Sequence, residues 1–333
     1  MPLLGLFLAG CPKPAAPPTQ PRTTITDSRP VNSQPGGFLG KSSRPSVDAN
    51  APADDPLTVL GNPDDATESP RNQDHFLMAR PQMTLSYNNT LRFPNWVAWH
   101  LKASDIGETE RSNFVPDPDL PSGFEAITTR DYSNSGYDRG HNCPSKDRTA
   151  SPEDNQVVFY MTNITPQQHG MNAGPWEGLE SYCRTLANSG NELYIMCGHG
   201  FRDKDFKTIG SDGIAVPDFG WKIVLVLPEK SGNDLERVTA ETRIITIQMP
   251  NISTISRQPW DKYLTTVTEL EKVTGQTFLK GISSSVAQIL KQKRDEGANS
   301  FAGGSSGFKK SNRRSSGGSF GSDAGGFGAG GRR

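Results

Sequence analysis

Between residues 138 and 148 the chain reads Asp-Arg-Gly-His-Asn-Cys-Pro-Ser-Lys-Asp-Arg. The histidine of this stretch, His141, follows Gly140, where the backbone can bend and approach another group closely. An imidazole can take up a proton near neutral pH and so act as a general base. The stretch opens a segment, residues 138–184, that is unusually dense in polar groups capable of catalysis.

The end of this segment predicts an amphipathic helix from Trp176 to Leu186. Glu180 and Arg184 lie four residues apart, so they project from one face, separate from the apolar face. Asn172 lies just ahead of the helix, where an anion is favoured. An amide oxygen with a carboxylate and water suits Mg²⁺, and Arg139 and Arg184 can each clamp a phosphate with two hydrogen bonds. Together these groups describe phosphodiester hydrolysis. The apolar face is formed by Leu179, Tyr182, Cys183 and Leu186.

Taken singly, each of these residues has a plainer interpretation. A histidine in a loop is usually structural, and a Glu/Arg pair four apart is usually a surface ion pair of little energetic value. Asparagines such as Asn163 and Asn172 are common turn residues. Their joint occurrence within 47 residues favours the catalytic interpretation.

The rest of the central region predicts an α+β fold. Apolar runs at 96–101, 193–197, 221–227 and 241–249 are typical of strands. A second helical pattern runs from Trp260 to Val273. Because strands and helices do not alternate regularly, we expect a mainly antiparallel central sheet with flanking helices.

Composition limits the function classes only broadly. The 333 residues include 34 Gly and 26 Pro, and the formal net charge is −1. The sequence contains no run of 18 or more apolar residues, so it predicts no internal transmembrane helix. Four cysteines in a chain of this length do not make a disulfide scaffold.

The two ends differ from the middle in composition. Residues 1–11 hold a short apolar run followed by Leu-Ala-Gly-Cys, which resembles the lipobox of bacterial lipoproteins, although no basic residue precedes it. We therefore expect export to the bacterial cell envelope, with Cys11 lipidated as the only membrane attachment, or secretion. Residues 12–72 predict a disordered, Pro-rich tether, 73–290 the catalytic domain, and 291–333 a disordered Gly/Ser/Arg-rich tail.

The 138–184 segment resembles the DNA/RNA non-specific endonuclease family, the ββα-metal nucleases with an Asp-Arg-Gly-His signature. The version here is similar to the secreted bacterial and cyanobacterial branch. The resemblance extends to residues 94–97, Val216-Pro217 with Trp221-Lys222, and Leu270-Glu271 with Thr274-Gly275. It covers roughly residues 80–285 and implies a ββα-metal motif at the active site.

The resemblance implies roles for the residues that match the motif. His141 matches the general base that activates the attacking water. Asn172 matches the single direct protein ligand of the metal, and Glu180 matches the residue that orients water on that metal. The polar residues expected to contact phosphate or to support the site are Arg139, Arg184, Asn163 and, in a looser local match, Arg111.

The activity implied is a metal-dependent cleavage of DNA and RNA to 5′-phosphorylated products, with Mg²⁺, Mn²⁺ or another divalent ion as cofactor. Contacts to phosphate rather than to base edges predict indifference to sequence and to sugar. Two alternatives stay open: a catalytically silent nucleic-acid-binding lipoprotein, and a phosphodiesterase for small substrates. A toxin role would require an inhibitor protein as partner.

Cysteines and the remaining histidines complete the expectations. Since the two elements of a ββα motif pack together, Cys143–Cys183 is the preferred disulfide, with Cys183–Cys197 as its rival. Structural or loop positions are expected for His75, His100, His169 and His199.

Overall fold

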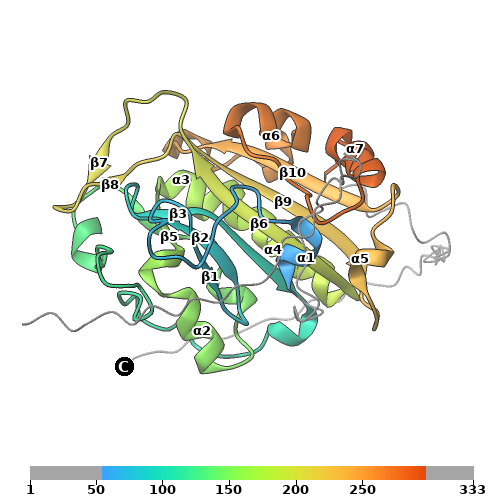
Figure 1. Ribbon diagram of the computed structural model, residues 1–333, viewed down its shortest axis with the longest axis horizontal. Helices are drawn as coiled ribbons and strands as arrows, with labels where there is room; N and C mark the ends of the chain where they lie inside the picture. The colour runs from blue at the N-terminus through green and yellow to red at the C-terminus, as the bar shows by residue number, and fades with distance from the viewer. Residues whose placement is uncertain (1–54, 298–333) are drawn as a thin grey trace, which may run out of the picture. The chain divides into compact units, whose positions relative to one another are not determined.

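A six-stranded antiparallel sheet forms the centre of the structure (Figure 1), a computed structural model that describes residues 55–297. The four long apolar runs of the sequence form four of its strands, as expected. The sheet confirms the α+β class. In spatial order its strands are β1 (Phe76–Ala79), β2 (Thr84–Asn88), β3 (Phe93–Leu101), β6 (Asn191–Gly200), β9 (Phe219–Pro228) and β10 (Arg243–Pro250).

Both faces of the sheet are buried, which explains why its central strands are almost continuously apolar. On β6, Leu193, Ile195 and Cys197 point to one hydrophobic cluster. Tyr194 and Met196, which alternate with them, point to a second cluster on the opposite face. The long pairing of β6 with β9, from Asn191↔Pro228 to Gly200↔Phe219, fixes which side chains face which layer.

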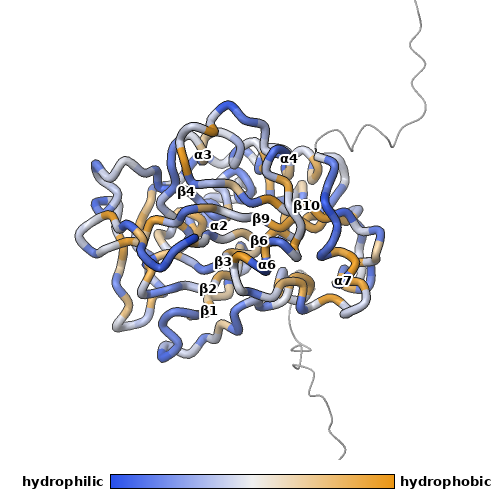
Figure 2. Tube along the Cα trace, turned by 90° about the horizontal axis from the view of Figure 1, so that it is seen from above, coloured by the Kyte–Doolittle hydropathy of each residue, from blue (hydrophilic) through white to orange (hydrophobic). Residues whose placement is uncertain are grey.

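The helices divide between the two faces, as Figure 2 shows with α3 and α4 on one side of the strands and α6 and α7 on the other. The α4 side also carries α2 and a separate two-stranded hairpin. This is the side on which the 138–184 segment lies. The helices are α1 (Pro56–Leu60), α2 (Pro152–Val158), α3 (His169–Met171), α4 (Glu177–Asn188), α5 (Asp234–Arg237), α6 (Val267–Thr274) and α7 (Ser284–Gln292); the small strands are β4 (Asp138–His141), β5 (Ile164–Gln167), β7 (Thr208–Ile209) and β8 (Ile214–Ala215).

The helix expected from 260 to 273 is broken into two pieces. Trp260–Tyr263 forms a 3₁₀ turn, and α6 begins only at Val267. Between them Leu264 makes a β-bridge to Ile247 on the sheet edge. Thr266 then caps α6 by accepting a hydrogen bond from the Glu269 backbone N–H. Tertiary pairing therefore overrides the helical periodicity here.

The ordered fold extends beyond the expected domain boundaries of 73 and 290. Helix α1 lies inside the predicted tether, yet its Val59 and Leu60 are buried in the second cluster. After α7, the carboxylate of Asp295 forms a bidentate ion pair with the guanidinium of Arg243. Cys11 and most of both predicted end segments lie outside the described residues. Within residues 55–297 no helix is long and apolar enough to cross a membrane.

Candidate active site

The hairpin of β4 and β5 carries the Asp-Arg-Gly-His signature beside helix α4. Its register pairs Asp138 with Gln167 and His141 with Ile164. Gly140 is required by space, because a Cβ at this position would lie 2.2 Å from Cδ of the buried Gln167 side chain. The hairpin, followed by α4, forms the expected ββα unit.

His141 is a neutral, partly buried imidazole held by aromatic rings. Its ring lies 5.1 Å from the Phe114 ring and 4.7 Å, edge to face, from the Phe159 ring. Within residues 55–297, Nε2 has no hydrogen-bond partner. Burial, with a smaller contribution from the Arg111 cation, lowers the pKa of His141 to about 3. The ring is therefore available as a proton acceptor at neutral pH.

Two exposed arginines lie on the same rings that hold His141. The Arg139 guanidinium lies 5.0 Å from the Phe114 ring centroid, and the Arg111 guanidinium lies 5.2 Å from that of Phe159. The two phenylalanines thus bring three of the sequence-predicted site residues together. Their aromatic surface orients both cations while leaving them exposed to an incoming anion.

Asn172 lies where the chain turns into α4, in a π-helical turn (Asn172–Trp176) interrupted at Gly174. Its Nδ2 donates a hydrogen bond of 2.9 Å to Oδ2 of Asp138, and Nδ1 of His169 lies 2.9 Å from the same oxygen. Within the described part of the chain, no residue donates to Oδ1 of Asn172. Asp138 therefore fixes the amide so that its oxygen is free for a ligand.

Glu180 is buried, although it lies on a face of the helix separate from the apolar face. Its Oε1 accepts a hydrogen bond of 3.1 Å from Nζ of Lys222, on strand β9. Burial raises the pKa of Glu180, and the Lys222 cation opposes that rise. The helix is buried on a second side because Glu180 packs on Lys222 of the sheet and Arg184 pairs with Asp147.

Arg184 is also largely buried and is already paired. Its guanidinium contacts Asp147 at 3.1 Å and Glu177 at 3.3 Å, and Asp147 also accepts a hydrogen bond from the Trp99 indole. Arg184 nevertheless lines a groove of about 550 Å³ together with Arg111 and Lys146. The structure thus places two predicted phosphate-binding arginines along one groove.

Asn163 lies inside the protein rather than in the groove. Its Oδ1 accepts from the Cys143 backbone N–H at 3.0 Å, and its Nδ2 donates to the backbone oxygens of Cys143 and Val158. Its backbone oxygen accepts from Asn142. Asn163 holds the turn after His141 in place, which makes it a positioning residue for the hairpin.

The expected disulfide is not formed. Cys143, Cys183 and Cys197 are all buried free thiols, so both Cys143–Cys183 and its rival Cys183–Cys197 are wrong as pairings in this structure. Cys143 is fixed through its backbone by Asn163, while the Cys197 thiol donates to Oδ1 of Asn142 at 3.6 Å. Burial raises the pKa of each thiol.

A divalent ion fits the donor set at Asn172. A free amide oxygen and a nearby acidic side chain on the same helical segment are the oxygen ligands and water acceptors that hard cations prefer. The Asp138 contact orients that amide in the way partners of metal ligands commonly do. Asn172 would hold the ion directly, and Glu180 would accept hydrogen bonds from water around it.

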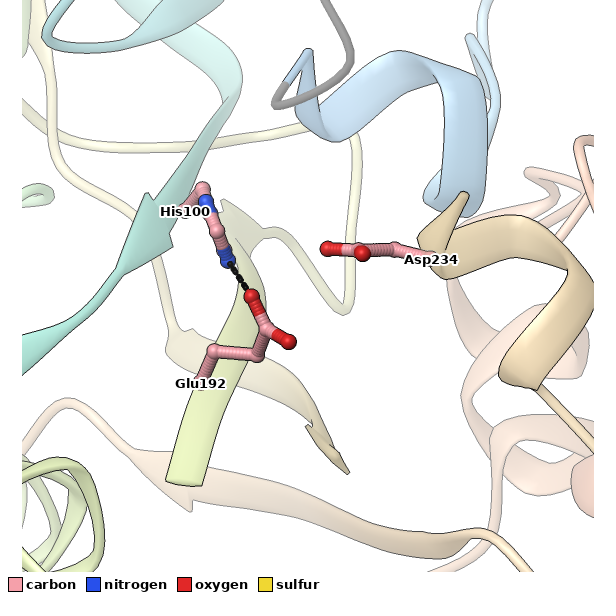
Figure 3. Close-up of side chains that lie close together, drawn as sticks. All are labelled: His100, Glu192 and Asp234. Carbon is pink, nitrogen blue, oxygen red and sulfur yellow. Dashed lines mark hydrogen bonds and ion pairs between the residues drawn. The ribbon is translucent and has the colours of Figure 1, made fainter. Parts of the chain in front are cut away.

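A second group of potential ligands, His100, Glu192 and Asp234, lies elsewhere (Figure 3). Nε2 of His100 lies 3.1 Å from Oε2 of Glu192, and Arg237 forms ion pairs with both carboxylates. The His100 ring stacks on Tyr194, on the sheet face opposite α4. Because an arginine already balances these carboxylates, the group is an ion-pair network on the wrong face for the hairpin.

His199 is buried beneath the candidate site, in strand β6, whereas the sequence predicts a turn position for it. Its ring packs on Trp176 and its Nε2 lies 3.1 Å from Nε2 of Gln167. Burial, aided by the Lys222 cation, lowers its pKa to about 3. The folded protein therefore holds this ring neutral in the range where an exposed histidine titrates.

The buried imidazole predicts that stability falls in mild acid. Below pH 6.5 the unfolded chain protonates at His199 while the folded chain does not, so the free energy of unfolding decreases as the pH falls from 6.5 toward 3. From pH 6.5 to 5 one such residue accounts for about 2 kcal/mol. Urea unfolding at several pH values should show a smaller decrease for His199→Gln than for the wild type; equal decreases would contradict the assignment.

Comparisons with known proteins agree with the geometry. The model of the DNA/RNA non-specific endonuclease family matches residues 62–285. A nuclease from Nostoc sp. is 44% identical over 239 residues, which cover 71% of this chain and 85% of that protein. The mitochondrial nuclease EXOG of Xenopus laevis is 31% identical over 67% of this chain and 62% of its own length.

A solved structure shares the fold at a lower level of identity. The EndoG/EndoGI complex contains a chain that is 24% identical, with a TM-score of 0.55, covering 66% of this chain and 94% of that chain. The family match and the Nostoc relative together settle the membership. This chain belongs to the DNA/RNA non-specific endonuclease family and is a hydrolase that acts on nucleic acids.

Proposed function

We propose that this chain is a metal-dependent endonuclease that cuts DNA and RNA alike and leaves 5′-phosphates. The observation that carries the proposal is the shared aromatic support of His141, Arg111 and Arg139. The same two rings hold a neutral imidazole and two exposed guanidinium groups. This arrangement suits attack by water on a phosphodiester.

In the proposed reaction, Nε2 of His141 accepts the proton of the attacking water, whose oxygen bonds to phosphorus while the bond to the 3′ oxygen breaks in line. The departing 3′ oxygen takes a proton from water and leaves as a hydroxyl. Burial is the main cause of the low pKa of His141, and the Arg111 cation adds to it. A phosphodiester bound at Arg111 supplies a negative charge that opposes this effect, so the basicity of the ring rises when substrate is present.

Phosphate binding rests on a few placed cations rather than on bulk charge. Residues 55–297 carry 24 Lys and Arg against 32 Asp and Glu, a net charge of −8. Arg111 and Arg139 are exposed at His141, and Arg184 and Lys146 line the groove next to it. Phosphate contacts carry no information on base identity, which supports cleavage without sequence preference.

Asn172 and Glu180 serve the divalent ion in this proposal, with Mg²⁺ as the expected ion and Mn²⁺ as a substitute. When bound, the ion neutralises charge on the phosphate and on the departing oxygen. Asn172 presents Oδ1 to it, and Asp138 keeps that amide from rotating.

Digestion of plasmid DNA, a structured RNA and a dinucleotide tests the proposal. We expect both polymers to be cut in Mg²⁺, neither in excess EDTA, and the dinucleotide poorly. The cut DNA should require phosphatase before a polynucleotide kinase can label it. Binding without cutting would support the silent binding protein instead, and equal use of the dinucleotide would support the small-substrate phosphodiesterase.

We also propose export to the cell envelope through the lipobox-like segment, with lipidation of Cys11, a residue outside the described part of the chain. The leucine-rich run before it supports this. Cys11→Ser should move the protein from the detergent phase to the aqueous phase of a cell extract. An inhibitor protein is a further proposed partner, because the EndoG chain of similar fold was solved with one.

A further inference from the structure

Lys222 is a buried cation that the reaction described above does not use. It lies in the middle of strand β9, where its neighbours across the sheet are Cys197 and Ile247. The residue is 1% exposed. Lysine is almost never buried to this extent unless it is paired. The residue that pairs with Lys222 therefore indicates the role of Lys222.

The surroundings of Lys222 connect it to both halves of the proposed metal site. Its Nζ lies 3.1 Å from Oε1 of Glu180. The same ammonium lies 4.2 Å from the ring centroid of Trp176, the last residue of the turn that begins at Asn172, and 5.6 Å from that of Trp99. Within residues 55–297, Glu180 is the carboxylate that Lys222 contacts.

Stability does not explain such a pair. Burying two charges costs several kcal/mol per ion before their attraction is counted, and replacing a buried pair by apolar residues is often neutral or stabilising. The pair also leaves one oxygen of Glu180 available, because no described residue donates a hydrogen bond to Oε2. A carboxylate with one oxygen fixed and one free is suited to binding water in a set orientation.

We propose that Lys222 is a positioning residue that holds Glu180 as an oriented carboxylate toward the metal site. The inference rests on the proposed function, since it assigns Glu180 to the water around a divalent ion. Lys222 acts through Glu180 and touches no reacting atom. Its aromatic contacts to Trp176 tie this orientation to the turn that presents Asn172.

The test measures Mn²⁺ binding by calorimetry without nucleic acid, together with kcat and KM for plasmid DNA. Lys222→Met keeps the length of the side chain and removes its charge. We expect Mn²⁺ affinity to fall about tenfold, the range seen when partners of metal ligands are removed, with lower kcat and unchanged KM. The double variant Lys222→Met/Glu180→Gln should bind Mn²⁺ no more weakly than Glu180→Gln.

A matched control is Lys291→Met, which breaks an ion pair with Glu271 between α6 and α7 on the other face and should change neither measurement. If Lys222→Met does not fold, Lys222→Gln, which retains a donor for Oε1, should give a smaller loss of affinity. Unchanged Mn²⁺ affinity in the folded variant, or additive losses in the double variant, would overturn the inference. A wild-type chain that neither binds Mn²⁺ nor cuts would overturn the proposed function and this inference with it.

Discussion

His141→Ala is expected to lower kcat for plasmid cleavage by about 10³-fold, within the range that a general base contributes. The reason is that, in the proposed reaction, the water proton passes to Nε2 of His141, which has no hydrogen-bond partner within residues 55–297. Arg111 and Arg139 lie on the same two phenylalanine rings as this imidazole. Both arginines keep their aromatic support when the imidazole is removed. Binding of DNA should therefore change by less than about threefold, since phosphate contacts supply most of the affinity.

Cleavage is measured on supercoiled plasmid with Mg²⁺, and binding by fluorescence anisotropy in EDTA. His75→Ala is the matched control, because His75 is an exposed histidine whose ring contacts Asp64 rather than the groove. The control should cut at the wild-type rate. Wild-type cleavage by His141→Ala, in a preparation free of other nucleases, would show that another residue is the base.

Asn172→Asp is expected to lower Mg²⁺-dependent cleavage by at least about 100-fold, the upper end of the losses produced by disturbing a metal ligand's environment. A carboxylate is in principle a good Mg²⁺ ligand. Here, however, the Asn172 amide nitrogen lies 2.9 Å from Oδ2 of Asp138. A carboxylate in its place would face another carboxylate, so the side chain would turn away or take up a proton.

The reciprocal exchange Asp138→Asn/Asn172→Asp separates this cause from simple loss of a ligand. It restores one amide and one carboxylate across the same 2.9 Å contact. We expect the double variant to recover at least tenfold over Asn172→Asp, measured as cleavage rate against Mg²⁺ concentration. If Asn172→Asp alone is fully active, or if the exchange recovers nothing, Asp138 has no part in orienting the ligand.

The sequence predicts the sheet well because its signals are local. The run that forms β9 is apolar from Ile223 to Leu227 and ends at a proline, as the strand does. The break at Leu264 is different, since it depends on a bridge to Ile247 that only the folded chain brings near. Helical periodicity alone cannot report such a competing partner.

The motif in the sequence predicts the candidate site residues, but it does not predict their environments. Glu180 and Arg184 have the spacing of a solvent-exposed pair, and their burial follows from Lys222 and Asp147, which lie 42 and 37 residues away in the chain. The available signal was Lys222 itself, a charged residue inside a strand whose neighbours are apolar on both faces. Asp138 and the two phenylalanines carry no spacing that distinguishes them from structural residues.

The buried thiols of Cys183 and Cys197 allow the separation of helix α4 from the sheet to be measured chemically. Cys183 lies on α4 and Cys197 on the strand beneath it, and burial raises the pKa of both to about 12, so neither offers a reactive thiolate. A thiol-specific reagent can reach them only when α4 separates from the sheet. The labelling rate of each peptide, followed in increasing urea, therefore measures how often α4 leaves the sheet, and whether it does so before the rest of the fold is lost.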